Sequence, residues 1–234
     1  MLNQSLVDYK YNIKQLSRSA MKTFSQLISE QEQINNTRKT QVATTGGTYE
    51  KTGAFLKDKV PAHSKVISIG AGLEHTGKAL KKGLGEGHTV HDMEPNPEGR
   101  KEKPEFTKAE EIPKNHYDAA VSHNVLNVVE PHVREHVMLS IFNSVKSGGH
   151  AVIGARKWKS DIEANKNHTL GDEPKSMWVH KGKERSYQKG FDGNELKDYV
   201  EDYAKRHGHK VEVKRLPGIA ANGVHVHVLS KKED

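Results

Sequence analysis

The chain contains no cysteine and no long apolar run. Without cysteine it has no disulfide, no cysteine-ligated zinc and no thiolate nucleophile, so reactions such as cytosine C5 methylation are excluded. No apolar run approaches the roughly 18 residues that a membrane span requires. We also recognise no signal peptide, and we therefore expect a cytoplasmic protein that does not enter the membrane.

Apolar residues are scarce as well, at 33% of 234 residues, whereas charged residues make up 29%. This length suits one α/β domain with attachments, built around an economical core. The formal net charge is +7, and the positive excess is concentrated in two segments. Residues 1–60 and residues 156–191 each hold 9 Lys/Arg against 5 Asp/Glu. Two basic segments suit a polyanionic partner, and the alternative is a basic surface without a partner.

The most informative segment is a β-branched run, Val66–Ile69, that leads into Gly70-Ala71-Gly72 and then into a helix-forming stretch. This pattern indicates a strand that stops abruptly so that its backbone can approach a nucleotide-like ligand beside a helix N-terminus. A second apolar run ends at Met93 and Glu94, and Glu94 follows Gly72 by 22 residues. A carboxylate at this spacing can accept both hydroxyls of an adenosine ribose. We therefore expect a nucleoside cofactor, and the alternative is an ordinary strand-to-helix turn.

The residues before this segment predict an N-terminal arm, residues 1–60. Apolar residues recur every three or four positions from Leu2 to Leu27, which predicts an amphipathic helix. Residues 35–53 are polar, basic and rich in Gly and Thr, which predicts a loop able to approach a ligand. The remaining residues, 61–234, are predicted to form one α/β domain.

Within that domain the alternation of strand and helix patterns is typical of a parallel sheet. Strands are expected at 65–70, 88–93, about 104–107, 117–122 and 149–155. Helices are expected at about 75–84, at 132–146 with Ser147-Gly148-Gly149 as its C-cap and turn, and from Gly193 to about His207. Two last strands, 211–216 and 224–229, have a connection short enough for an antiparallel hairpin. Residues 157–190 interrupt the alternation and predict an inserted loop or small subdomain.

With these elements in place, the chain resembles the class I S-adenosylmethionine-dependent methyltransferases. The segments that carry the likeness are 68–72, Glu94, 107–113, 117–126 and 145–153. The resemblance implies an α/β, Rossmann-like fold in residues 61–234, with a seven-stranded, mostly parallel sheet that ends in an antiparallel hairpin. To this fold the chain adds the N-terminal helical arm and a basic insert at 157–190.

The same resemblance implies S-adenosyl-L-methionine as the cofactor. The expected cofactor contacts are Gly70, Ala71, Gly72, Met93, Glu94, Ala109, Glu110 and Ser122. Three positions depart from the superfamily pattern: Ser68 and Lys108 replace frequent acids, and Glu74 replaces the third glycine. These departures place cofactor affinity in question. No metal is expected, because the pairs His132/His136 and His225/His227 lack a visible third ligand.

A looser likeness connects the chain to the methyltransferases associated with DNA phosphorothioation. It rests on residues 124–130, Arg156 and residues 186–189, and it favours DNA as the partner. Trp178 and Tyr187 lie among basic residues, as a site for an unstacked base and its phosphates requires, although both could equally pack the insert onto the body. The predicted substrate-binding residues are Arg38, Lys39, Arg156, Trp178, Tyr187 and Lys189.

The candidate catalytic residues, His123, Asn124 and Asn127, follow the strand predicted at 117–122. Methyl transfer from a sulfonium is an in-line displacement, so the protein mainly positions donor and acceptor. His123 could remove a proton from the acceptor or simply line the cofactor. The asparagines could bind a base edge, and Asn127 could instead cap the next helix. We expect methyl transfer to a nitrogen or oxygen of nucleic acid, DNA being favoured; the alternatives are a small-molecule methyltransferase and a catalytically silent nucleic-acid-binding protein.

Overall fold

The structure is a computed structural model, and it describes residues 45–72, 75–182, 184–220 and 223–230. The amphipathic helix predicted from Leu2, together with Arg38 and Lys39, lies outside the described residues. Among the described residues, no helix is both long and apolar enough to cross a membrane.

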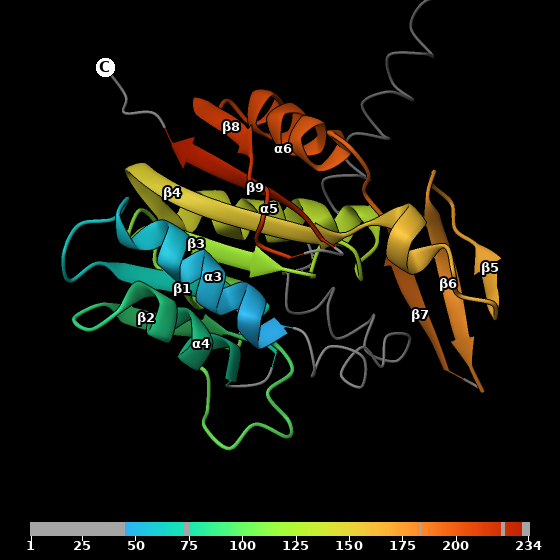
Figure 1. The fold of residues 1–234 in the computed structure, drawn as a ribbon, viewed down its shortest axis with the longest axis horizontal. Helices are drawn as coiled ribbons and strands as arrows, with labels where there is room; N and C mark the ends of the chain where they lie inside the picture. Colours follow the sequence, from blue (N-terminus) through green and yellow to red (C-terminus); the bar gives the residue numbers. More distant parts are fainter. Residues whose placement is uncertain (1–44, 73–74, 183, 221–222, 231–234) are drawn as a thin grey trace, which may run out of the picture.

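A six-stranded sheet in the order β2-β1-β3-β4-β9-β8 forms the centre of the fold (Figure 1). Its strands are β1 (Lys65–Ile69), β2 (Thr89–Met93), β3 (Tyr117–His123), β4 (Val145–Arg156), β8 (Val211–Arg215) and β9 (Gly223–Ser230). The first four strands are parallel, and β9 runs antiparallel to both β4 and β8. The mostly parallel sheet with a final antiparallel hairpin is therefore confirmed.

The expected strand at 104–107 is absent from this sheet. Phe106 makes only an isolated parallel bridge with Met93, next to β2. The sheet in the described part of the chain thus has six strands and not the expected seven. The flanking sequence explains this, because residues 94–105 are polar and rich in Pro and charge, which disfavours a strand.

Helices cover both faces of the sheet (Figure 1). Helices α3 (Thr45–Lys57) and α4 (His75–Leu84) pack on one face, where Leu56, Leu80 and Val121 belong to one buried cluster. Helices α5 (Pro131–Ser144) and α6 (Glu195–Arg206) cover the other face. The central strands are buried on both sides, as their β-branched runs require.

Helix α3 corrects the prediction that residues 35–53 form a loop. Residues 45–57 are helical, whereas residues 35–44 lie outside the described part of the chain. Gly53, one of the glycines that suggested a loop, instead permits close helix packing: a Cβ there would overlap the carbonyl oxygen of Leu80, and a Cβ on Gly83 of α4 would overlap that of Glu50. The two helices cross at backbone contact, and this contact fixes α3 against α4.

The end of the second predicted helix is also corrected. Helix α5 ends at Ser144, and β4 begins at once at Val145 rather than after a glycine turn. The extra residues form an irregularity in the pairing of β3 with β4, since Tyr117 pairs with Val145 and Ala119 with His150. Gly148 lies in this irregularity with φ of 76°, which glycine adopts without strain.

Residues 157–190 form a separate structure that we call the small sheet. A short π-helix (Trp158–Ile162) leads into β5 (His168–Leu170), β6 (Ser176–Lys181) and β7 (Glu184–Lys189), which pair antiparallel in that order. The small sheet lies beyond the end of β4, on the side toward which β1 and β3 point (Figure 1). It therefore stands beside the carboxyl edge of the main sheet.

Candidate functional site

The candidate site lies at the carboxyl ends of β1 and β3, where the strand order changes direction. Open α/β sheets bind ligands at such switch points. The loop after β1 holds Gly70 and Gly72 at φ of 70° and 63°, in the left-handed region. The N–H groups of Gly70 and Ala71 both donate to the carbonyl oxygen of Met93, at 3.0 and 3.1 Å. The end of β2 thus fixes the glycine loop directly.

Glu94 holds the next residue of the loop. Its Oε2 accepts the N–H of Gly72 at 2.6 Å, and its Oε1 accepts the N–H of Asn96 at 3.0 Å. Both carboxylate oxygens of Glu94 therefore contact backbone N–H groups on either side of the strand end. The predicted proximity of the glycine loop and this acid is therefore present in the structure.

The other predicted cofactor residues surround the same edge. Ala109 and Glu110 belong to a short 3-10 helix (Ala109–Glu111), in which Ala109 packs on the core and Glu110 is exposed. Ser122 lies near the end of β3, and its buried hydroxyl has no hydrogen-bond partner in the described structure. A buried hydroxyl without a partner is uncommon and marks a place for a ligand or a water molecule.

His123 faces α3 rather than an open cleft. Its Nε2 lies 2.8 Å from Thr52 Oγ1, and the ring of Tyr49 packs edge-on against it at 4.9 Å between centroids. Its Nδ1 faces Gly154, where it lies close to the ring of His225. Burial, and then the neighbouring His225, lower the pKa of His123 well below its ordinary value. The imidazole is therefore neutral and enclosed by protein on both nitrogen sides.

The two predicted asparagines occupy different environments. Asn124 has φ of 60° and donates its backbone N–H to the carbonyl oxygen of Gly154 at 2.9 Å. Asn127 is completely buried, and neither atom of its side-chain amide has a hydrogen-bond partner among the described residues. The backbone carbonyl oxygen of Asn127 accepts the N–H of Lys189 at 2.7 Å, and this hydrogen bond attaches β7 of the small sheet to the segment after β3. Asn127 is not the N-cap of α5, since Glu130 holds that position.

Most of the predicted substrate-binding residues in or next to the small sheet make internal contacts. Arg156 forms a two-point ion pair with Asp161, with both N–O distances at 2.5 Å. Tyr187 is 2% exposed and donates its hydroxyl to Glu173. The ammonium of Lys189 donates to the carbonyl oxygen of Pro174 at 2.6 Å, and burial lowers its pKa.

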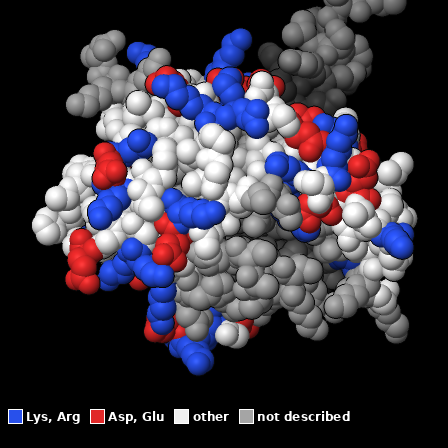
Figure 2. All heavy atoms as spheres, in the orientation of Figure 1, with Lys and Arg blue, Asp and Glu red and all other residues white. Residues whose placement is uncertain are grey.

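Trp178 differs from these three residues. It is half-buried, and the guanidinium of the exposed Arg185 lies over its ring at 4.4 Å from the centroid. An aromatic ring paired with a cation offers both a stacking surface and a phosphate partner. On the face of the molecule shown in Figure 2, basic and acidic side chains are interspersed over the described surface.

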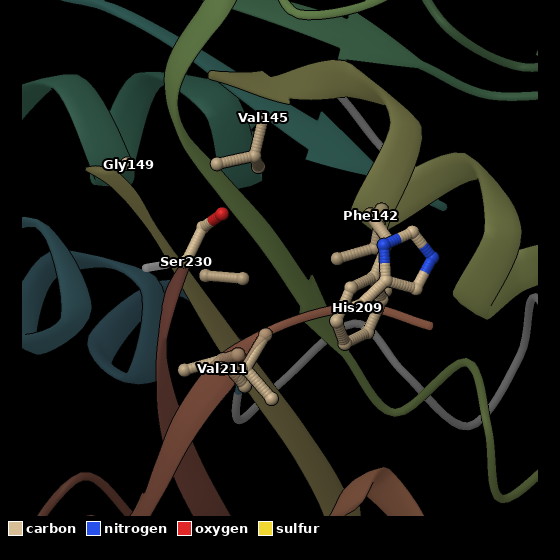
Figure 3. Close-up of a pocket in the computed structure, with 9 residues that line it drawn as sticks. Phe142, Val145, Gly149, His209, Val211 and Ser230 are labelled. Carbon is tan, nitrogen blue, oxygen red and sulfur yellow. The ribbon is translucent and has the colours of Figure 1, made fainter. Parts of the chain in front are cut away.

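The described structure also contains a small cavity at the opposite end of the sheet (Figure 3). Its volume is about 30 Å³, and Phe142, Val145, His209 and Val211 contribute to its lining. This space suits about two water molecules and no organic ligand. Among the described residues, no group of three or more His, Asp or Glu side chains is arranged to hold a metal ion.

Comparisons with known proteins place the fold among solved structures. No family model and no curated protein sequence matches the chain. An S-adenosylmethionine-dependent methyltransferase from Clostridium acetobutylicum matches by structure with a TM-score of 0.54 and 11% identity, over 82% of this chain and 94% of that one. The 1,6-didemethyltoxoflavin-N1-methyltransferase of Burkholderia thailandensis, solved with S-adenosylhomocysteine, matches with 0.51 and 17%, over 82% of each chain. The chain shares the α/β architecture of these methyltransferases.

One further neighbour has a different description. A Rhodobacter sphaeroides protein described as a Zn-dependent alcohol dehydrogenase matches with a TM-score of 0.57 and 14% identity, over 81% of this chain and all of that one. Identities this low establish the shared architecture alone. The contacts of the glycine loop must therefore decide between the ligands of these two classes.

Three residues near the site were not predicted from the sequence. Tyr49 and Thr52 reach His123 from α3, and they were missed because the segment was read as a loop. Arg100 contacts the glycine loop from the polar segment after Glu94. A single arginine in a polar loop carries no periodic signal, so its burial was evident only in the structure.

Proposed function

We propose that the protein is an S-adenosylmethionine-dependent methyltransferase. The observation that carries this proposal is the pairing of the glycine loop, in which the N–H groups of Gly70, Ala71 and Gly72 all donate to Met93 and Glu94. A dinucleotide requires loop N–H groups of this kind for its pyrophosphate. Because these three donors are already used, the loop favours a nucleoside ligand without phosphate over a nicotinamide dinucleotide.

The residues present suit an adenosyl ligand. Glu94 would accept the ribose hydroxyls, and Gly70 to Gly72 would allow the ligand to approach the backbone closely. Ala109 and Glu110 would line the adenine, while Met93 and Ser122 would complete the pocket. When bound, S-adenosylmethionine supplies an activated methyl group for in-line displacement, so the task of these residues is to orient the donor.

Of the three candidate catalytic residues, we assign the acceptor contact to Asn127. Its amide has an unpaired donor and an unpaired acceptor, which complement a base edge or another amide. His123 is directed at Thr52 and Gly154, so we assign it to shaping the floor of the site. Asn124 supports the same segment through its left-handed backbone.

For the acceptor we propose nucleic acid, with DNA as the favoured form. The net charge of +7 and the pairing of Trp178 with Arg185 support this proposal. Methylation would take place on a nitrogen or oxygen of a base that stacks on Trp178 after leaving the duplex. Arg38 and Lys39, whose sequence context suits phosphate contacts, belong to the same proposal.

A small heterocyclic acceptor is the second candidate. The internal contacts of Arg156, Tyr187 and Lys189 favour it, because they leave fewer basic side chains for phosphates. The Burkholderia neighbour is named for methylation of such a compound. In this case the small sheet would close over the acceptor instead of presenting a platform.

Isothermal titration calorimetry with S-adenosylhomocysteine tests the cofactor. We expect the unsubstituted protein to bind it and Glu94→Gln to weaken binding at least tenfold, since a charged hydrogen bond to the ribose is lost. Exposed Glu86 provides the control variant Glu86→Gln, which should bind normally. Tighter binding of NADH than of S-adenosylhomocysteine would contradict the proposal.

Nucleic-acid binding at increasing salt tests the acceptor class. Phosphate contacts release counterions, so the affinity for duplex DNA should fall steeply as the salt concentration increases. At a fixed salt concentration, Trp178→Ala should bind the DNA more weakly than the unsubstituted protein. Transfer of a labelled methyl group to the DNA would support the enzyme, whereas binding without transfer would support a silent nucleic-acid-binding protein. Salt-independent, negligible binding would favour the small-molecule acceptor.

A further inference from the structure

Arg100 is a buried cation in direct contact with the glycine loop. Its Nη1 donates to the carbonyl oxygen of Gly72 at 2.5 Å, and its Nη2 donates to Asp92 Oδ2 at 2.6 Å. The side chain is only 3% exposed, although it belongs to a polar segment. Its Nε donates to the carbonyl oxygen of Glu102 at 3.2 Å, so all three guanidinium nitrogens have partners.

Gly72 is thereby held from both sides. Its N–H donates to Glu94, and its carbonyl oxygen accepts from Arg100. Both side chains come from the segment that follows β2, so the segment carrying the expected ribose carboxylate also sets the position of the loop. Gly72 has a left-handed φ of 63°, which glycine adopts without strain, so the backbone conformation alone does not fix its position.

Asp92 places the guanidinium where it can make this contact. Its carboxylate lies against the first turn of α4, where a Cβ on Gly77 would come within 2.6 Å of Oδ1. Asp92 pairs in register with Ser68 of β1, beside the glycine loop. A planar guanidinium can bridge two acceptors in fixed directions, which a lysine ammonium does not do.

We infer that Arg100 is a positioning residue of the cofactor site, which fixes the carbonyl of Gly72 so that Gly72 and Glu94 keep the spacing that an adenosyl ligand requires. This inference rests on the proposed function. Arg100 is not expected to touch the ligand, and it acts only through Gly72 and Asp92.

The experiment compares S-adenosylhomocysteine affinity with thermal stability in matched variants. Arg100→Ala alone would leave Asp92 as an unpaired buried charge, so the principal variant is Arg100→Ala combined with Asp92→Asn. We expect this double variant to bind S-adenosylhomocysteine at least tenfold more weakly than Asp92→Asn alone, with a similar Tm. Arg100→Lys provides a second test, in which the charge at Asp92 is retained and affinity still falls several-fold.

Lys78→Ala is the control, because it removes the exposed ion pair of Lys78 with Glu102 in the same loop without changing the contact to Gly72. It should bind like the unsubstituted protein. Addition of millimolar guanidinium to the double variant should restore part of the lost affinity by occupying the vacated place. Equal affinity of the double variant and Asp92→Asn would overturn the inference alone, whereas failure of the unsubstituted protein to bind would overturn the proposed function as well.

Discussion

The glycine loop and the small sheet both border the carboxyl edge of the main sheet, but they are held there by different interactions. Backbone hydrogen bonds to Met93, the carboxylate of Glu94 and the guanidinium of Arg100 fix the glycine loop. The small sheet depends on a buried charged group: Arg134 of α5 pairs with Glu173, and Glu173 also accepts the hydroxyl of Tyr187. Burial would raise the pKa of Glu173, but the hydrogen bonds from Arg134 and Tyr187 lower it overall.

This difference indicates which of the two regions can unfold while the other stays folded. Backbone contacts survive most substitutions, so we expect the glycine loop to change only where Glu94 or Arg100 is replaced or where an added side chain cannot fit. Side-chain charge pairs fail when one partner is removed. We therefore expect the small sheet to separate from the main sheet while the cofactor site remains formed.

Replacement of Arg134 by Met should produce the largest effect. It leaves the carboxylate of Glu173 without its cation in a mostly buried place, and the expected loss of unfolding free energy is about 3 kcal/mol. Hydrogen exchange should accelerate in β5 to β7 but not in β1 and β2, and S-adenosylhomocysteine affinity should stay within twofold.

The exposed pair of Arg206 with Glu135 provides the matched control. Arg206→Met should cost less than about 1 kcal/mol, as surface ion pairs do. If Arg134→Met accelerated exchange equally in both sheets, the two regions would be one cooperative unit and the comparison would fail.

Replacement of Gly70 by Ala tests the other region. Gly70 has positive φ, and its new Cβ would also overlap the side chain of Val125. Strain and overpacking together should cost about 2–4 kcal/mol and reduce cofactor binding. Chemical denaturation and calorimetry would measure the two effects.

Gly99→Ala measures the backbone strain without overpacking, because Gly99 has a similar φ of 83° and no atom lies within 4 Å of the added Cβ. It should cost only about 1 kcal/mol. Equal losses in the two variants would show that the contact with Val125 does not limit the loop.

The same division explains what the sequence could predict. Apolar periodicity located the strands of the main sheet and the helices at 75–84 and 195–206, because each pattern reflects a local burial requirement. The glycine loop and Glu94 were found together because their spacing follows from one strand-helix-strand unit. Contacts between distant segments carry no such pattern.

Arg100, Tyr49 and Glu173 illustrate the second case. Each is an ordinary polar or aromatic residue in sequence, and its importance comes from a partner many positions away. Glycine was also ambiguous, because Gly53 and Gly83 serve helix contact whereas Gly70 and Gly72 serve a turn. Residue type alone does not distinguish these two uses.

Acidification should have the smallest effect, and it tests the boundary between the two regions. Gly154 of β4 pairs with His123 of β3 on one side and with His225 of β9 on the other, and burial lowers the pKa of His225 to about 4. Because the unfolded chain binds a proton near pH 6.5 and the folded protein does not, acid favours unfolding. From pH 7 to pH 5 this histidine should cost about 2 kcal/mol of stability.

His225→Gln should remove that part of the pH dependence. Urea denaturation at pH 7 and pH 5 would measure the difference. His123 and His227 have lowered pKa values for the same reason and should retain their share of the slope in the variant.

Since His123 and His225 lie on the α3 face of the main sheet, hydrogen exchange at low pH should increase first in α3, next to the glycine loop, and not in the small sheet. An unchanged slope in His225→Gln would mean that this histidine is already solvated in the folded protein, and the enclosure of His123 by α3 would then have to be revised.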